Sequence, residues 1–131
     1  MSRHPVRTRP PTGLMPSLPA SDLSATRDFY VRDLGLRAEV ESPGRLRIRV
    51  GGAAVEFRQH DGAYHGDDGL RLTFACPDPD GMLQRLRALG VEVDAPPSAG
   101  GGVRFFARDP DGRLVAFTKA GSDTAPQAAG Q

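Results

Sequence analysis

The clearest pattern in the chain is a strict alternation of apolar and charged side chains over residues 45–50. Three apolar residues alternate there with three arginines: Leu46, Ile48 and Val50 with Arg45, Arg47 and Arg49. Successive side chains of a strand point to opposite faces, so this period of two predicts a half-buried strand. Gly51-Gly52 is typical of a two-residue hairpin, and residues 53–58 return as a strand with Val55 and Phe57 on its apolar side.

A helix is predicted before this hairpin. Four apolar side chains recur at helical spacing: Ala25, Phe29, Tyr30 and Leu34. Ser21 or Asp22 can cap the N-terminus of the helix, and Gly35 supplies the left-handed residue that commonly ends one. The pattern therefore predicts a helix over residues 23–34, followed by a strand at 36–40.

The order of elements repeats in the second half of the chain. Asp78 precedes a second helical pattern, which Gly90 ends just as Gly35 ends the first. Strands are predicted around and after this helix, at residues 70–76, 91–95, 103–108 and 113–118. Like elements are offset by about 55 to 60 residues, which is typical of an internal duplication. Each half has too little apolar surface for a core of its own, so the halves are expected to pack together.

These boundaries predict one domain over residues 14–119, made of modules at about 14–59 and 69–119. A polar loop rich in Gly and Asp joins the two modules. Residues 1–13 contain several prolines, residues 120–131 are mostly small or polar, and neither segment is periodic. Both ends are therefore expected to be disordered tails.

Composition and charge exclude several classes of partner. The chain has 17 Lys and Arg against 16 Asp and Glu, and a formal net charge of +1 does not favour nucleic acid or an anionic membrane. No stretch approaches the ~18 apolar residues of a membrane span, and the arginines near the N-terminus precede no apolar signal core. Cys76 is the only cysteine, so no internal disulfide can form. We therefore expect a cytoplasmic protein without nucleic-acid or membrane partners.

The sequence carries no familiar catalytic signature. Ser-His-Asp, Cys-His and P-loop patterns are missing, and the loop between the modules does not match a calcium-loop spacing. His60 and His65 lie in that loop without a spacing that would direct both at one ion. A solvated pair of histidines is therefore the favoured interpretation.

Two stretches resemble the vicinal oxygen chelate superfamily, which includes glyoxalase I, extradiol dioxygenases and bleomycin-resistance proteins. The first is Leu18-Pro19-Ala20-Ser21-Asp22-Leu23 followed by Phe29-Tyr30 and Leu34-Gly35-Leu36, and the second is FFARDPDGRLVAF at residues 105–117. The second is most similar to the bleomycin-resistance branch. The resemblance implies an α+β fold of two tandem βαβββ modules, with curved mixed sheets that carry their helices on the convex side. It also implies a homodimer that forms two ligand grooves.

Enzymes of that superfamily hold one divalent cation with four His, Glu or Gln side chains. The resemblance assigns these ligand positions to Met15 or its neighbour Leu14, Glu56, Arg71 and Ala116. Only Glu56 can coordinate a hard cation, Arg71 would bring positive charge to the ion, and a shift of one residue supplies no further ligand. We therefore expect neither a metal site nor a cofactor.

The arginines of the alternating strand are expected on the groove face, because their apolar neighbours face the helix. The candidate ligand-binding residues are Met15, Arg47, Arg49, Glu56, Arg58, Arg71, Thr73, Phe106, Ala116 and Thr118. A partly desolvated arginine favours an anion, so the ligand is expected to carry a carboxylate, a phosphate or a polarised carbonyl. The alternative is that these arginines point into solvent or pair with Glu39, Glu41 and Glu92.

The leading interpretation is metal-independent binding and sequestration of a small antibiotic or metabolite in the grooves of a homodimer. Phe105, Phe106 and Tyr64 are the candidate stacking groups for such a ligand. The alternative is a glyoxalase- or dioxygenase-like enzyme acting on a small carbonyl or hydroxylated compound, with Glu56 as general base or with a metal brought by the substrate. A structural or regulatory module without a ligand is the third interpretation, and the fold alone does not decide among them.

Overall fold

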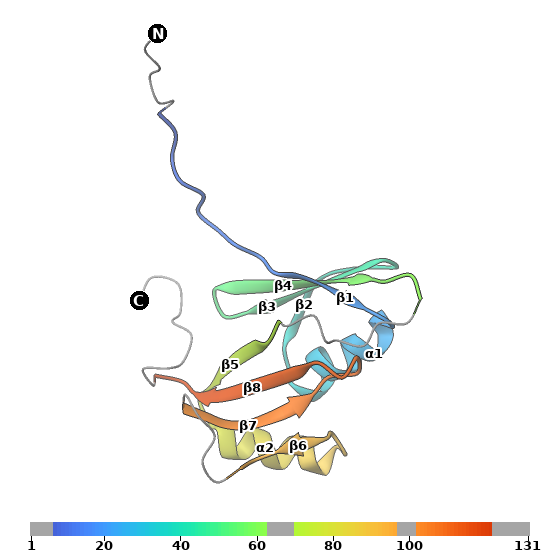
Figure 1. Cartoon of the computed structure of the whole chain (residues 1–131), viewed down its shortest axis with the longest axis vertical. Helices are drawn as coiled ribbons and strands as arrows, with labels where there is room; N and C mark the ends of the chain where they lie inside the picture. The colour runs from blue at the N-terminus through green and yellow to red at the C-terminus, as the bar shows by residue number, and fades with distance from the viewer. Residues whose placement is uncertain (1–6, 63–69, 97–101, 122–131) are drawn as a thin grey trace.

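Two four-stranded mixed sheets, each with its own helical segment, make up the part of the chain that the structure describes (Figure 1). The structure is a computed structural model, and it describes residues 7–62, 70–96 and 102–121. Within these ranges, no helix has the length and apolar character needed to cross a membrane. The two sheets share one strand order and one pattern of pairing directions. The predicted α+β fold of two βαβββ modules is therefore confirmed.

The first module contains the alternating hairpin. Its elements are β1 (Ser17–Ala20), α1 (Leu23–Arg27), η1 (Asp28–Asp33), β2 (Arg37–Ser42), β3 (Arg45–Val50) and β4 (Ala53–Gln59). The strands lie in the order β1-β4-β3-β2, with β1 parallel to β4 and the other pairs antiparallel. Leu46 and Ile48 of β3 pair with Phe57 and Val55 of β4, and all four side chains are buried. The predicted alternation is therefore confirmed.

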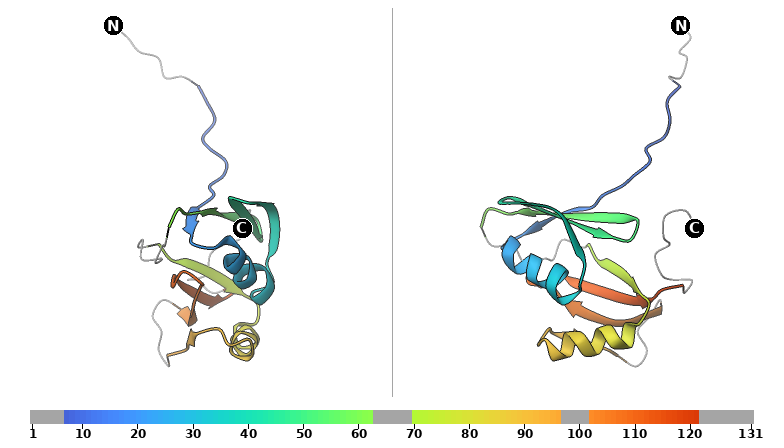
Figure 2. Two further views of the ribbon diagram at one scale, coloured as in Figure 1. Left: turned by 90° about the vertical axis from the view of Figure 1, so that its right-hand side faces the viewer. Right: turned by 180° about the vertical axis from the view of Figure 1, so that it is seen from behind.

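The second module repeats this arrangement. Its elements are β5 (Leu72–Cys76), α2 (Pro79–Ala88), β6 (Val93–Asp94), β7 (Val103–Arg108) and β8 (Leu114–Lys119). The strands lie in the order β5-β8-β7-β6, with β5 parallel to β8. Helix α1 packs against β3 and β4, whereas α2 packs against β6 and β8, so each helix covers one face of its own sheet (Figure 2).

The predicted helix at 23–34 is right in extent but wrong in type over its second half. Asp22 caps it as expected, accepting a hydrogen bond from the backbone N–H of Ser24 at 2.9 Å. From Asp28 the helix widens into a π-helix, in which the N–H of Leu34 donates to the carbonyl of Phe29 at 3.0 Å. Apolar spacing does not distinguish these two kinds of turn, because both bury the same face. Gly35 then adopts a φ of 80°, as expected for the residue that ends the helix.

Two predicted strands are corrected at their first residues, because the backbone N–H groups there donate to acceptors outside the sheet. The strand expected at 91–95 spans only Val93–Asp94, since the N–H of Val91 donates to the carbonyl of Leu86 at the end of α2. The last strand begins at Leu114, because the N–H of Arg113 donates to Asp109 within the preceding turn. Smaller shifts affect the strands expected at 36–40, 53–58 and 70–76, which are observed at Arg37–Ser42, Ala53–Gln59 and Leu72–Cys76.

One buried core runs through both modules. The ring of Tyr30 in η1 lies 4.7 Å from the ring of Phe57 in its own module and 6.3 Å from Phe74 of the second module, measured between centroids. The rings of Phe105 and Phe117, both in the second module, stack with their centroids 4.4 Å apart. The halves therefore pack together, as expected for modules too small to bury separate cores.

A buried polar network also crosses between the modules. Asp109 Oδ2 accepts a hydrogen bond from the Tyr30 hydroxyl at 2.8 Å and forms an ion pair with Arg113 Nη1 at 2.7 Å. Arg113 is fully buried, and its Nη2 donates to the carbonyl of Pro19 at 3.0 Å. Burial, reinforced by the negative charge of Asp109, holds the pKa of Tyr30 well above its ordinary value. This network ties the β7–β8 turn to β1 and η1.

Candidate functional site

A buried carboxylate surrounded by arginines lies on the face of the first sheet that points away from α1. Glu56 is only 2% exposed, and its Oε1 lies 3.3 Å from Arg47 Nη2 and 3.5 Å from Arg45 Nε. Its Oε2 lies 3.0 Å from Arg58 Nη2. We call these four residues the Glu56 cluster.

The strand register explains why the cluster forms. Glu56 lies between two core residues of β4, Val55 and Phe57, so its side chain must point to the opposite face. Across the hairpin, Arg47 pairs with Glu56 and Arg45 pairs with Arg58, which brings all four side chains to one face.

The cluster has more positive charge and more donors than its single carboxylate can satisfy. Three guanidinium groups against one carboxylate leave two positive charges in excess. The Nε atoms of Arg45 and Arg47 are buried and donate no hydrogen bond. Buried donors without an acceptor are costly, so this face is suited to an anionic or carbonyl oxygen.

Arg49 lies outside the cluster, although it was a candidate ligand-binding residue. Its Nε donates to Oε2 of Glu39 at 2.7 Å, and this hydrogen bond lowers the pKa of Glu39 from its ordinary value. The pairing with Glu39 that the sequence left open is thus found for Arg49. Glu41 instead pairs with Arg27 of α1, at 2.6 Å.

Four candidate residues of the second module form a separate group on β5, β7 and β8, with Arg71 immediately before β5. The guanidinium carbon of Arg71 lies 5.7 Å from the centroid of the Phe106 ring, within cation–π distance. Phe106 pairs with Ala116, and Ala116 pairs with Thr73, so these residues are neighbours across the sheet. We call Arg71, Thr73, Phe106 and Ala116 the Arg71 group.

The other candidate positions lie outside the Glu56 cluster and the Arg71 group. Thr118 is buried, and its hydroxyl donates to the carbonyl of Phe74 at 3.4 Å. Phe105 packs in the core, so Phe106 is the one of the two adjacent rings that points away from it. Met15 is partly exposed just before β1, whereas Tyr64 and His65 lie outside the described residues. Within the described ranges, no hydrogen bond, ion pair or ring contact joins the Arg71 group to the Glu56 cluster.

The four positions that would hold a family metal do not fit a cation in this chain. Glu56 already has three guanidinium groups around its carboxylate, and a divalent ion would have to approach through them. Met15, Arg71 and Ala116 offer no oxygen or nitrogen donor with a free lone pair on their side chains. No group of at least three His, Cys, Asp or Glu side chains that could hold a metal occurs among the described residues.

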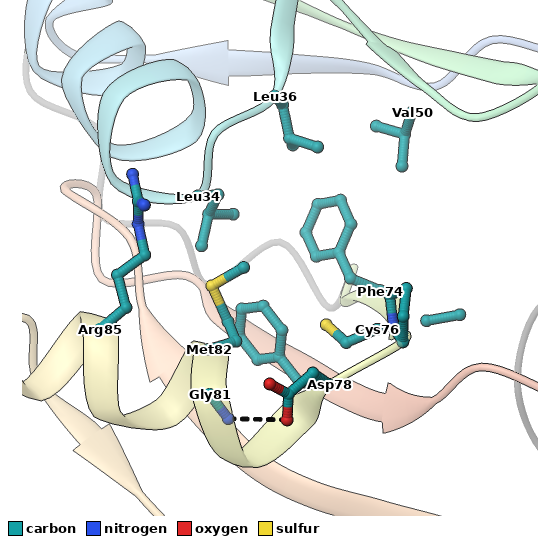
Figure 3. A pocket seen from close by; sticks show the side chains of 12 residues that line it. Leu34, Leu36, Val50, Phe74, Cys76, Asp78, Gly81, Met82 and Arg85 are labelled. Atoms are coloured by element: carbon teal, nitrogen blue, oxygen red, sulfur yellow. Dashed lines mark hydrogen bonds between the residues drawn. The ribbon is translucent and has the colours of Figure 1, made fainter.

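A pocket of about 410 Å³ lies elsewhere, at the seam between the two modules (Figure 3). It is lined by Leu34, Leu36, Val50, Phe74, Ala75, Cys76, Pro77, Asp78, Gly81, Met82, Arg85 and Phe117. We call it the seam pocket. None of its lining residues was among the candidate ligand-binding residues. The sequence marks most of them only as core positions of separate elements.

Known proteins share this fold over most of their length. A bleomycin resistance determinant encoded on the transposon Tn5 superposes with a TM-score of 0.69 at 21% identity, covering 86% of this chain and 100% of that one. A bleomycin-binding protein complexed with bleomycin superposes with a TM-score of 0.67 at 21% identity, covering 83% of this chain and 98% of that one. TnmS3, an antibiotic-binding protein from Streptomyces sp. CB03234, superposes with a TM-score of 0.67 at 28% identity, covering 86% of this chain and 98% of that one.

Sequence comparison assigns the family directly. A search of curated proteins gives no match. The family model described as the Glyoxalase/Bleomycin resistance protein/Dioxygenase superfamily, however, matches residues 13–117, which include every strand and helix of both modules except the last two residues of β8. The chain therefore belongs to the Glyoxalase/Bleomycin resistance protein/Dioxygenase superfamily.

Proposed function

We propose that this protein binds and sequesters a small antibiotic or metabolite without a protein-held metal, as a cytoplasmic homodimer. The observation that carries the proposal is the Glu56 cluster. At the family's metal position the one available carboxylate is enclosed by arginines, so the site has the charge of an anion receptor instead of a cation receptor.

The chemistry of the arginines defines the ligand class. A guanidinium group is planar and always charged, and its paired donors match the two oxygens of a carboxylate or phosphate. Two excess positive charges favour a dianion over a monoanion, and a neutral carbonyl compound should bind more weakly still. Arg71 and the Phe106 ring offer a flat surface for a planar part of the ligand.

The similarity to TnmS3 supports sequestration as the role, because that protein is described as antibiotic-binding and is 28% identical to this chain. A dimer would explain why no hydrogen bond, ion pair or ring contact joins the Glu56 cluster to the Arg71 group within the described part of one chain. In a homodimer, the cluster of one protomer can face the group of its partner across a groove.

Binding of small probe ligands tests the proposal. Phenyl phosphate, benzoate, methylglyoxal and benzylamine would be titrated calorimetrically into the full chain, and we expect affinity to fall in that order. Arg47→Ala should weaken phenyl phosphate binding about tenfold, which corresponds to about 1.4 kcal/mol.

The matched control is Arg27→Ala, because Arg27 is also a partly exposed, glutamate-paired arginine but lies on α1. This variant should bind like the wild type. Preferred binding of benzylamine, or equal affinity of wild type and Arg47→Ala, would contradict the proposal. A divalent ion retained stoichiometrically after dialysis would instead favour the enzymatic alternative, and sedimentation as a monomer would contradict the homodimer.

A further inference from the structure

We propose that the seam pocket is a second binding site, for a compact, uncharged, apolar molecule. The site is independent of the proposed anion receptor, because it lies on the helix side of the sheets and shares no residue with the Glu56 cluster or the Arg71 group.

The shape of the pocket is that of a ligand site. Its volume of about 410 Å³ falls within the range of small-molecule pockets in proteins. Residues from both modules form its walls, with Leu34, Leu36 and Val50 facing Phe74 and Met82 across the opening (Figure 3). Phe74 and Phe117, which lie 5.8 Å apart between ring centroids, supply an aromatic surface.

The chemistry of the pocket excludes a charged occupant, because its polar side chains already bond to the protein. Asp78 Oδ1 accepts a hydrogen bond from the N–H of Gly81 at 3.0 Å, as the N-cap of α2 (Figure 3). Arg85 donates from Nε to the carbonyl of Asp33 at 2.7 Å and from Nη2 to the carbonyl of Arg32 at 2.9 Å. These two groups also carry opposite charges, so the pocket offers a ligand apolar area and no net charge.

Cys76 is the remaining polar side chain and adds no charge at neutral pH. Burial, with a smaller contribution from Asp78, raises the pKa of its thiol, which therefore stays protonated. A neutral thiol beside aromatic rings is a soft, weakly polar surface. The occupant is thus expected to bind by burial of its own apolar surface.

Binding at the seam would also stabilise the folded chain. The occupant touches both modules at once, so it binds the packed form and not the separated one. Phe117 of β8 lines the pocket, while its neighbour Ala116, a member of the Arg71 group, alternates to the opposite face of the sheet.

N-phenyl-1-naphthylamine, an uncharged apolar fluorophore, is the probe for the test. We expect its fluorescence to rise on titration with the full chain, and Met82→Trp, which fills the pocket, to weaken binding about tenfold or more. Leu89→Trp is the matched control, since Leu89 is 50% exposed next to the same helix and does not line the pocket. It should bind the probe like the wild type.

Cys76 provides a second measurement in the unmodified protein. As the only cysteine in the chain, it reports on the pocket alone. Saturating probe should slow its reaction with a thiol reagent several-fold and raise the Tm by several degrees. Met82→Trp should keep its affinity for phenyl phosphate, so that failure of this inference is distinguishable from failure of the anion receptor.

Three results would overturn the inference. One is the absence of a fluorescence rise, and another is equal probe binding by Met82→Trp and the wild type. The third is a rate of Cys76 modification that falls with protein concentration but not with probe, which would mean that a second copy of the chain covers the pocket.

Discussion

At the scale of single residues, Glu56 holds together a set of like charges that would otherwise repel one another. Its carboxylate is the only acidic group in contact with Arg45, Arg47 and Arg58 among the described residues. The arginines are between 29% and 62% exposed, so water screens part of their repulsion. Glu56 itself is buried, and its removal leaves the guanidinium groups without a counter-charge.

Glu56→Gln is therefore expected to lower the free energy of unfolding by about 1 to 3 kcal/mol. The excess positive charge of the cluster rises when the carboxylate is lost, so added sulfate should raise the Tm of Glu56→Gln more than that of the wild type. Thermal unfolding with and without sulfate measures both effects.

Glu39→Gln serves as the control for Glu56→Gln. Glu39 also pairs with one arginine of β3, but at a more exposed position, so this change should cost at most about 1 kcal/mol. If sulfate raised the Tm of the wild type, Glu56→Gln and Glu39→Gln equally, the Glu56 cluster would not attract anions.

How far the sequence predicts this site depends on the residue. Alternation places Glu56, Arg47 and Arg58 on one face, because the core positions beside them are plainly apolar. Alternation places Arg45 on this face too, although it was not a candidate ligand-binding residue, and its contact with Glu56 depends on the hairpin register that sets it opposite Arg58. The pairing of Arg49 with Glu39 depends in turn on the β2–β3 register, which the sequence does not specify.

At the scale of elements, the same kind of residue ends the helix of each module. Gly35 and Gly90 have φ values of 80° and 78°, a left-handed conformation that side chains with a Cβ rarely adopt. Because a glycine ends both helices, the sequence pattern locates both helix C-termini.

Gly35→Ala is expected to destabilise the protein by about 1 to 2 kcal/mol, because alanine is strained at this positive φ. A Cβ at Gly35 would meet no other atom within 4 Å, so backbone strain is the only cost. Urea unfolding measures the difference.

The matched control is Gly44→Ala in the β2–β3 turn. This position has equally open surroundings but no positive φ, so the variant should be as stable as the wild type or slightly more so. If both variants lost the same stability, conformational strain would not be the cause.

Element boundaries were harder to predict than element types. Strands alternate and helices repeat over several residues, so their kinds and order can be inferred from one sequence. Their ends depend on single hydrogen bonds, such as that from Val91 to Leu86, which takes Val91 out of β6. The π-turn at Asp28–Asp33 leaves no separate mark in the apolar spacing.

At the scale of the whole molecule, the sequence predicts that the modules pack but not how they meet. Self-similarity of the halves indicates the duplication, and their small size indicates a shared core. The seam pocket arises where η1, β3, β5, α2 and β8 come together, and no local pattern encodes that meeting. No local pattern encodes the network of Tyr30, Asp109 and Arg113 either, because Tyr30 and Arg113 are 83 positions apart in the chain.

The network of Tyr30, Asp109 and Arg113 makes the stability of the contact between the modules depend on alkaline pH. Asp109 Oδ2 accepts from Tyr30, and the phenol must stay protonated to donate. Because burial and Asp109 raise the pKa of Tyr30 above its ordinary value of about 10, the folded state holds this proton more tightly than the unfolded state. Stability from Tyr30 is thus fully present below pH ~10 and is lost as the pH rises from there toward the folded-state pKa.

Tyr30→Phe should accordingly be less stable than the wild type at neutral pH, by about 1 to 3 kcal/mol, since Asp109 loses a buried hydrogen bond. Above pH ~10 the wild type should lose stability faster than the variant, so the difference between them narrows. Cys76, whose pKa is also raised, contributes equally to both proteins and cancels in the comparison. Urea unfolding at a series of pH values measures the difference in free energy of unfolding between the two proteins. If that difference stays constant across the alkaline range, the hydrogen bond from the protonated Tyr30 hydroxyl to Asp109 does not stabilise the contact between the modules.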